Sequence, residues 1–285
     1  MANVWLILNV FIALPFISYS FIIFDVDYLS DGLIFLPNNA IDNVIIKEDK
    51  KEENYMQNYI DKQKEISSDN DDYDDRWKNG YVLWKVYPPF KELLEYRIHD
   101  RIKKAMSEIE SKTCIKFFRI PDNVKLKETP WVRFYEEKNY TYPEGLNCMS
   151  VGGSLFPGQD LMLGKDCMTH SMILHELLHA LGFLHEHQRP DRDDYLNVNL
   201  TGIPDYLHRQ FEKISYMPTN LRKFDYESVL LYGPFDGLSG VKDRPVLTRK
   251  DGQRMLDRND KPGLSKGDVD MINKHYNCPP KLNRL

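Results

Sequence analysis

One short stretch constrains this chain more than any other feature. Residues 175–185 read HELLHALGFLH, and His175 and His179 are four positions apart. On an α-helix this spacing places both imidazoles on one face, about one turn apart, where they can share a metal ion. The glycine that follows breaks the helix at little cost because it lacks a Cβ, and the bend brings His185 round as a third ligand. Glu176 is placed to reach a water on the metal without binding the metal itself.

The number of ligands indicates the kind of metal site. Three neutral histidine nitrogens leave one position of Zn²⁺ open, which is typical of a catalytic zinc site and not of a closed structural one. A buried amphipathic helix with two satisfied histidines is the alternative for the five-residue HExxH pattern. The longer pattern, with its glycine and third histidine, is a zinc-protease signature. We therefore predict one Zn²⁺ per chain.

Composition excludes some other classes of protein. Of the 285 residues, 42% are hydrophobic and 12% aromatic, which is enough for a packed core. This length suits one large domain or a domain with an appendage. The net charge of −5 gives no basic footprint for nucleic acid.

The N-terminus is typical of a secretory protein. Residues Val4–Phe24 are almost uninterruptedly apolar, and Ser18 and Ser20 are small residues suited to cleavage after Ser20. We predict a signal peptide over residues 1–20. An uncleaved anchor is the alternative, because about 20 apolar residues can span a bilayer. No Lys or Arg precedes the apolar run, which weakens both interpretations.

Residues 21–67 are predicted to form a prosegment with an acidic linker. From Lys47 to Asp75 charged and polar residues dominate, and no apolar stripe is sustained. Such a run is usually solvated and mobile. It also suits a linker exposed to an activating protease.

Cysteines and sequons support the secretory route. The chain has four cysteines: Cys114, Cys148, Cys167 and Cys278. An even count predicts two disulfides, and the spacing alone leaves three pairings open. Asn139 and Asn199 begin N-glycosylation sequons, and both are candidate glycosylation sites.

Local patterns predict several secondary-structure elements. We expect a long helix over Lys91–Glu110, strands over Cys114–Ile120 and Trp131–Glu136, a loop over Gly152–Gly164, a metal-binding helix over Met168–Leu181, and a last helix from a capping box at Leu264–Asp268 to about His275.

The extended stretch His175–Tyr195 resembles the astacin family of secreted zinc endopeptidases. Beyond the histidines, the resemblance is carried by Glu186 and by the charged run after it: Arg189, Asp191, Arg192 and Asp193. Further matches lie on both sides: Arg76-Trp77, Gly80, Thr113-Cys114-Ile115, Gly152-Gly153, Gln159, Cys167, Gly252-Gln253-Arg254, Leu264-Ser265, Asp268 and Tyr276-Asn277-Cys278. The resemblance covers about residues 68–279, which are the expected catalytic domain, followed by a short tail over 280–285.

The resemblance implies an α+β fold of the two-lobed metzincin type. Its N-terminal lobe would hold a twisted sheet with long helices, and its C-terminal lobe would be mostly irregular with one terminal helix. It implies the disulfides Cys114–Cys278 and Cys148–Cys167. It also places the strand at 131–136 along the edge of the cleft, where a peptide substrate adds as an extended antiparallel strand.

The resemblance also implies catalytic roles. Glu176 is the expected general base. The family turn Ser-x-Met-His-Tyr is matched by residues 228–232, and its tyrosine, here Tyr232, is the expected oxyanion stabiliser. Leu230 and Leu231 replace the family methionine and histidine. The alternative for Tyr232 is a packed core tyrosine.

Two further residues are implicated in activation. Glu186 is expected to anchor the new N-terminus formed by maturation; the alternative is a surface carboxylate paired with Arg189 or Arg192. Asp31 is the candidate zymogen switch that blocks the zinc, although an ordinary turn aspartate is equally compatible. His187 and His208 are expected to be exposed and not to bind the metal.

The predicted function is that of a secreted zinc-dependent endopeptidase, made as a zymogen, that hydrolyses internal peptide bonds of proteins. Its expected partners are protein or peptide substrates and an activating protease. We expect an extracellular monomer without stable membrane association or nucleic-acid binding. A secreted zinc-binding pseudoprotease that binds peptides or a partner is the alternative, supported only by the altered turn at Leu230 and Leu231.

Overall fold

A computed structural model of the chain describes its structure from residue 74 onward. The described ranges are 74–86, 92–121, 123–135, 148–164, 167–219, 222–235 and 244–280. The predicted signal peptide and prosegment, with Asp31, lie outside the described residues, as does the sequon at Asn139.

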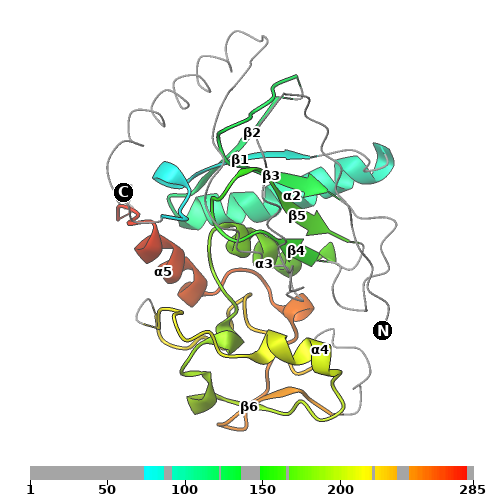
Figure 1. Ribbon diagram of the computed structural model, residues 1–285, viewed down its shortest axis with the longest axis vertical. Helices are drawn as coiled ribbons and strands as arrows, with labels where there is room; N and C mark the ends of the chain where they lie inside the picture. The colour runs from blue at the N-terminus through cyan, green and yellow to red at the C-terminus, as the bar shows by residue number, and fades with distance from the viewer. Residues whose placement is uncertain are drawn as a thin grey trace, which may run out of the picture.

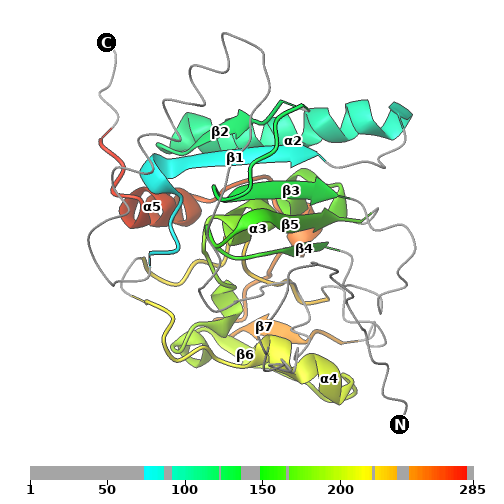
Figure 2. The same ribbon diagram turned by 45° about the horizontal axis from the view of Figure 1, so that its top comes forward.

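A five-stranded sheet forms one half of the molecule (Figures 1 and 2). Across the sheet the strands are β2 (Lys116–Arg119), β1 (Tyr81–Val86), β3 (Trp131–Tyr135), β5 (Pro157–Leu163) and β4 (Cys148–Ser150). Neighbouring strands are parallel except for β4, which is antiparallel to β5. In β3 every second residue is buried, as expected for a strand whose side chains alternate between two faces.

Two sequence-based expectations about this sheet were wrong. The strand over 131–136 does not lie at an edge, because β3 pairs with β1 on one side and β5 on the other. The two edge strands are β2 and β4, and the one on the side of helix α3 (His170–Ala180) is β4, which is only three residues long. The stretch 152–164, expected to be a loop, contains β5. Its glycines dominated the local pattern, whereas the apolar run Leu161–Leu163 is buried by pairing with β3 and β4.

Two helices pack together on one face of the sheet (Figure 2). They are α2 (Glu92–Lys112) and α3 (His170–Ala180), so the predicted helices at 91–110 and 168–181 are confirmed to within two residues at each end. Thr169 caps α3 by accepting a hydrogen bond from the Met172 amide at 3.3 Å. A first core lies between helices and sheet and includes Ile102, Ile109, Val132, Phe134, Ile173, Leu177, Val229 and Leu230.

The other half contains little regular structure, as expected. Its elements are η3 (Glu186–Gln188), η4 (Arg192–Asp194), β6 (Leu196–Val198), α4 (Asp205–His208), η5 (Arg209–Phe211), β7 (Leu247–Arg249) and η6 (Arg258–Asp260); η1 (Lys78–Gly80) precedes β1 in the first half. Strands β6 and β7 form an antiparallel pair. A second core gathers here and includes Leu196, Leu207, Phe211, Phe224, Leu231, Tyr232 and Leu247.

The last helix returns to the sheet half of the molecule. Helix α5 (Lys266–His275) begins at the predicted capping box, in which Ser265 and Asp268 bond each other's backbone amides. Its residues Met271 and Ile272 belong to the first core. The structure contains both disulfides that the resemblance implies, Cys114–Cys278 and Cys148–Cys167. The first of them ties the segment that follows α5 to the segment that leads into β2.

Within the described residues, no helix combines the length and the apolar character needed to span a bilayer.

Candidate metal centre

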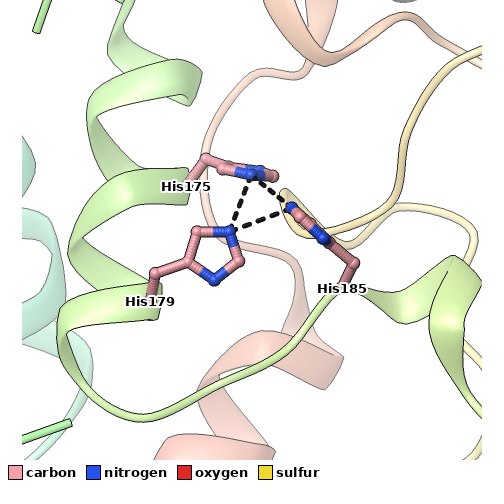
Figure 3. A group of neighbouring side chains, drawn as sticks. All are labelled: His175, His179 and His185. Atoms are coloured by element: carbon pink, nitrogen blue, oxygen red, sulfur yellow. Dashed lines mark hydrogen bonds between the residues drawn. The ribbon is translucent and has the colours of Figure 1, made fainter. Parts of the chain in front are cut away.

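The three candidate ligands come from α3 and the turn that ends it. His175 and His179 project from successive turns of α3, and the chain then reverses at Gly182, whose φ is +93°. A side chain there would be strained, and a Cβ would also lie 3.3 Å from an oxygen of the Asp75 carboxylate. The reversal returns His185 to the same point (Figure 3).

The three rings converge through one nitrogen each (Figure 3). The Nε2 atoms lie 3.0 Å apart for His175 and His179, 3.0 Å for His179 and His185, and 3.1 Å for His175 and His185. A tetrahedral Zn²⁺ bound at 2.0–2.1 Å requires nitrogens about 3.3 Å apart, so the spacing is close to that of a zinc site. All three side chains are buried.

The hydrogen bonds of the Nδ1 atoms fix the direction in which each ring presents the lone pair of its Nε2 atom. Nδ1 of His175 lies 2.7 Å from the Val229 carbonyl oxygen, and Nδ1 of His179 lies 2.7 Å from the Phe183 carbonyl oxygen. Nδ1 of His185 lies 2.9 Å from Oε1 of Gln188. These oxygens only accept, so each Nδ1 carries the proton and each neutral ring turns its Nε2 lone pair inward. Three converging lone pairs repel one another unless a cation binds them, which is the arrangement of a metal site.

Burial keeps these rings neutral. Desolvation lowers the pKa of all three histidines, and that of His179 falls to about 4. The neighbouring histidines lower the pKa values of His175 and His185 further. Neutral imidazole is the form that binds a metal, so the residues are ready to act as ligands at neutral pH.

The turn over residues 228–232 lies beneath the histidines and between the two cores. Val229 and Leu230 belong to the first core, whereas Leu231 and Tyr232 belong to the second. Leu230 is fully buried, so an apolar floor is present where the family has methionine. Lys261, itself buried, donates to the Ser228 carbonyl oxygen and, at 2.7 Å, to that of Leu231.

Tyr232 lies beside the cluster. Its ring centroid is 4.8 Å from that of His185 and 6.3 Å from that of His175. Its hydroxyl donates to Oε1 of Gln210 at 3.4 Å, and the Arg258 guanidinium lies 4.1 Å from the ring centroid. The side chain is 1% exposed, so the position suits both a packed core tyrosine and a residue that acts at the metal. The catalytic role of Tyr232 stays a prediction, as does that of the buried Glu176.

Glu186 is not the surface carboxylate of the alternative interpretation. It is 1% exposed, and its Oε1 is 3.2 Å from Nη1 of Arg189 and 2.8 Å from Nη1 of Arg222. The Asp225 amide donates to the same oxygen at 2.8 Å. Burial raises the pKa of Glu186, while Arg222 and Arg189 oppose that rise. Arg192 pairs with Asp193 instead. Anchoring of a new N-terminus by Glu186 stays a prediction.

The expectation that His187 is exposed was wrong. His187 is fully buried, its ring stacks on His185 with centroids 5.0 Å apart, and its Nε2 lies 3.0 Å from the Gln210 carbonyl oxygen. Among the described residues, the group that could hold a metal consists of His175, His179 and His185, and His187 is not part of it. The His208 side chain is 38% exposed, close to expectation, and it too lies outside that group. Asn199, the described sequon residue, is exposed.

Sequence reasoning missed several residues that support the site. Gln188 orients His185 from three positions further along the chain, a spacing that could have been noticed. Arg222, Lys261 and Arg258 come from segments without a recognisable motif, and only the fold brings them to the turn.

A buried three-histidine cluster, formed by a helix and its glycine turn beneath a mixed sheet, defines a metalloprotease of the zinc-dependent class. The sequence model of the Astacin peptidase family matches residues 69–277. The chain is 35% identical over 214 residues to astacin-like metalloprotease toxin 2 of Loxosceles intermedia, covering 72% of this chain and 75% of the toxin. It is 32% identical over 211 residues to zinc metalloproteinase nas-4 of Caenorhabditis elegans, covering 72% and 60%.

A solved structure gives the same result. High choriolytic enzyme 1, a hatching-enzyme zinc protease from the medaka fish Oryzias latipes, matches with a TM-score of 0.59 and 27% identity, over 72% of this chain and 94% of that one. The chain therefore belongs to the astacin family. It is an astacin-like zinc metalloendopeptidase with the α+β fold of that family.

Proposed function

We propose that the protein is a secreted endopeptidase, made as a zymogen, that cleaves internal peptide bonds with one Zn²⁺ held by His175, His179 and His185. The observation that carries this proposal is the convergence of three Nε2 atoms within 3.1 Å while each Nδ1 donates to an oxygen. Neutral, buried and pre-oriented rings are what a zinc site with an open position requires.

The chain's own residues would then divide the chemistry. Bound Zn²⁺ supplies a Lewis acid that acidifies water and polarises the scissile carbonyl. Glu176 accepts the proton of the attacking water and passes it to the leaving amine. The Tyr232 hydroxyl donates to the oxygen on which negative charge develops. The hydrogen bond of this hydroxyl to Gln210 is 3.4 Å long, so it can be exchanged at little cost.

The substrate would bind as an extended strand at the edge of the sheet. The outermost strand on the side of α3 is β4, so a peptide would add to β4 as an antiparallel strand. Two disulfides suit an extracellular protein, which we propose acts as a monomer. Removal of the prosegment by an activating protease, a switch role for Asp31, and glycosylation of Asn139 and of the exposed Asn199 complete the proposal.

Cleavage of a protein substrate by activated protein tests the function. We expect trypsin-activated wild type to cleave casein or gelatin, a chelator to abolish the cleavage, and added Zn²⁺ to restore it. Glu176→Ala should keep one zinc per chain by elemental analysis and lose turnover. An activated wild type that holds zinc but cleaves nothing would favour the pseudoprotease alternative, and near-normal activity of zinc-loaded Glu176→Ala would exclude the role of Glu176.

A further inference from the structure

A single buried guanidinium bridges the two segments that flank the histidine cluster. The Arg222 side chain is 6% exposed. Its Nη1 donates to Oε1 of Glu186 at 2.8 Å, and its Nη2 donates to Oγ of Ser228 at 3.2 Å. A planar guanidinium with several fixed donors is suited to hold two partners at once, whereas an ammonium acts as one point charge.

Two partners of Arg222, Glu186 and Ser228, are each tied to a candidate metal ligand. Glu186 directly follows His185, and its amide donates to the Leu230 carbonyl oxygen at 3.0 Å. Ser228 begins the turn in which the next carbonyl oxygen, that of Val229, accepts from Nδ1 of His175 at 2.7 Å. The guanidinium therefore connects the loop that carries His185 with the turn that orients His175.

The charge of Glu186 is balanced within the catalytic region itself. Arg189 and Arg222 both contact Oε1 of the carboxylate, and the Asp225 amide donates to it. A buried carboxylate without such partners would be strongly unfavourable. Both cations also contact other carboxylates: Arg189 lies 2.8 Å from Asp191, and Arg222 lies 3.7 Å from Asp268 and 3.9 Å from Asp225. Arg222 is the one that also reaches the turn.

We propose that Arg222 is a positioning residue that fixes the loop of His185 against the turn of His175. We also propose that Arg222 supplies the cation that balances Glu186, in place of the new N-terminus that the family resemblance predicts as its partner. The proposal rests on the proposed function and deepens it. It predicts that activity depends on Arg222 and does not depend on an exact mature N-terminus.

Three substitutions test the positioning role. Arg222→Met removes the charge, and Arg222→Lys keeps the charge but loses the planar guanidinium that donates to two partners. Lys223→Met is the matched control at an exposed neighbour. Loss of a residue that orients metal ligands typically costs 10–100-fold in metal affinity or activity. We expect Arg222→Met to release zinc to a chelator at least about tenfold faster and to lower kcat about tenfold with little change in KM. Arg222→Lys should recover part of both losses, and Lys223→Met should match wild type.

A double-mutant cycle separates positioning from a general loss of stability. If Arg222 acts through Glu186, the effect of Arg222→Met on zinc release should shrink in a Glu186→Gln background, because the buried charge is already gone. Strictly additive effects, or zinc release from Arg222→Met equal to that from Lys223→Met, would overturn the positioning role. Zinc release requires no turnover, so this result is independent of whether the protein proves to be a peptidase.

The N-terminus is tested separately. Activated wild type carrying a few additional N-terminal residues should keep its kcat within about twofold, which corresponds to about 0.4 kcal/mol. A tenfold loss on extension would show that a free terminus is needed and would overturn the second half of the proposal.

Discussion

Asp268 links the start of α5 to the turn beneath the histidines, so replacing it should destabilise the protein strongly. It is fully buried and accepts from Ser228 Oγ at 2.6 Å, from the Val229 amide at 3.0 Å and from the Ser265 amide at 3.2 Å. In Asp268→Ala the N-cap Ser265 keeps its bond from the amide of residue 268, but the reciprocal bond from the Ser265 amide is lost, which costs about 1 kcal/mol. Each buried donor left without a partner costs about 1–3 kcal/mol. Because Ser228 Oγ can rotate while the Val229 amide cannot, we expect a total loss of about 3–5 kcal/mol.

The assay is urea unfolding of zinc-free protein at pH 7, since bound metal would add its own stabilisation to the folded state. Asp270→Ala in the same helix is the matched control, because Asp270 is half-exposed and pairs with the almost fully exposed Lys266. Such a pair contributes little, so the control should change the free energy of unfolding by less than about 1 kcal/mol. A loss below about 1 kcal/mol for Asp268→Ala, or equal losses in both variants, would refute the reasoning.

Three further results are expected. Tyr232→Phe should lower kcat more than it changes KM in steady-state kinetics, and an unchanged kcat would remove Tyr232 from the reaction. Zinc-free protein should lose stability as the pH falls below about 6.5, because the unfolded chain takes up protons there that the fold rejects. The fold rejects these protons mainly because the histidines are buried: burial lowers the pKa of His179 to about 4 and that of His187 to about 3. Each such histidine contributes up to about 1.4 kcal/mol per pH unit, so a urea midpoint that is constant from pH 7 to pH 5 would contradict the assignment. Replacing both Cys148 and Cys167 by serine opens a loop with a sequence separation of 19 residues and should cost about 3 kcal/mol in urea unfolding, whereas no change would mean that loop entropy is not what this disulfide contributes.

The metal cluster could be predicted because its information is local. The i, i+4 spacing of His175 and His179 fixes their common helix face without reference to the rest of the fold. The glycine at position 182 takes a positive φ, so the return of His185 is also encoded within a few residues. The helical period that predicts α2 and the capping box of α5 are local signals of the same kind.

The strands were less predictable because their pairing is not local. Which strand lies at the edge on the side of α3 depends on β4, a three-residue segment that the sequence pattern does not distinguish from a loop. Its neighbour β5 begins with Pro157 and Gly158, two residues that indicate a turn when they are read alone. Only pairing with β3 and β4 makes this segment a strand.

The sequence did not indicate that Asp268 and Lys261 are buried, for a reason that follows from the position of the turn. Residues 228–232 pass between two apolar cores, so their backbone groups are removed from water and need partners. The turn's own side chains cannot provide them all, because Leu230 and Leu231 fill the cores. Asp268 and Lys261 therefore reach in from distant segments to bond its amides and carbonyls. A sequence pattern assigns such residues to the surface, whereas the backbone amides and carbonyls of a turn buried between two cores require polar partners that are buried with them.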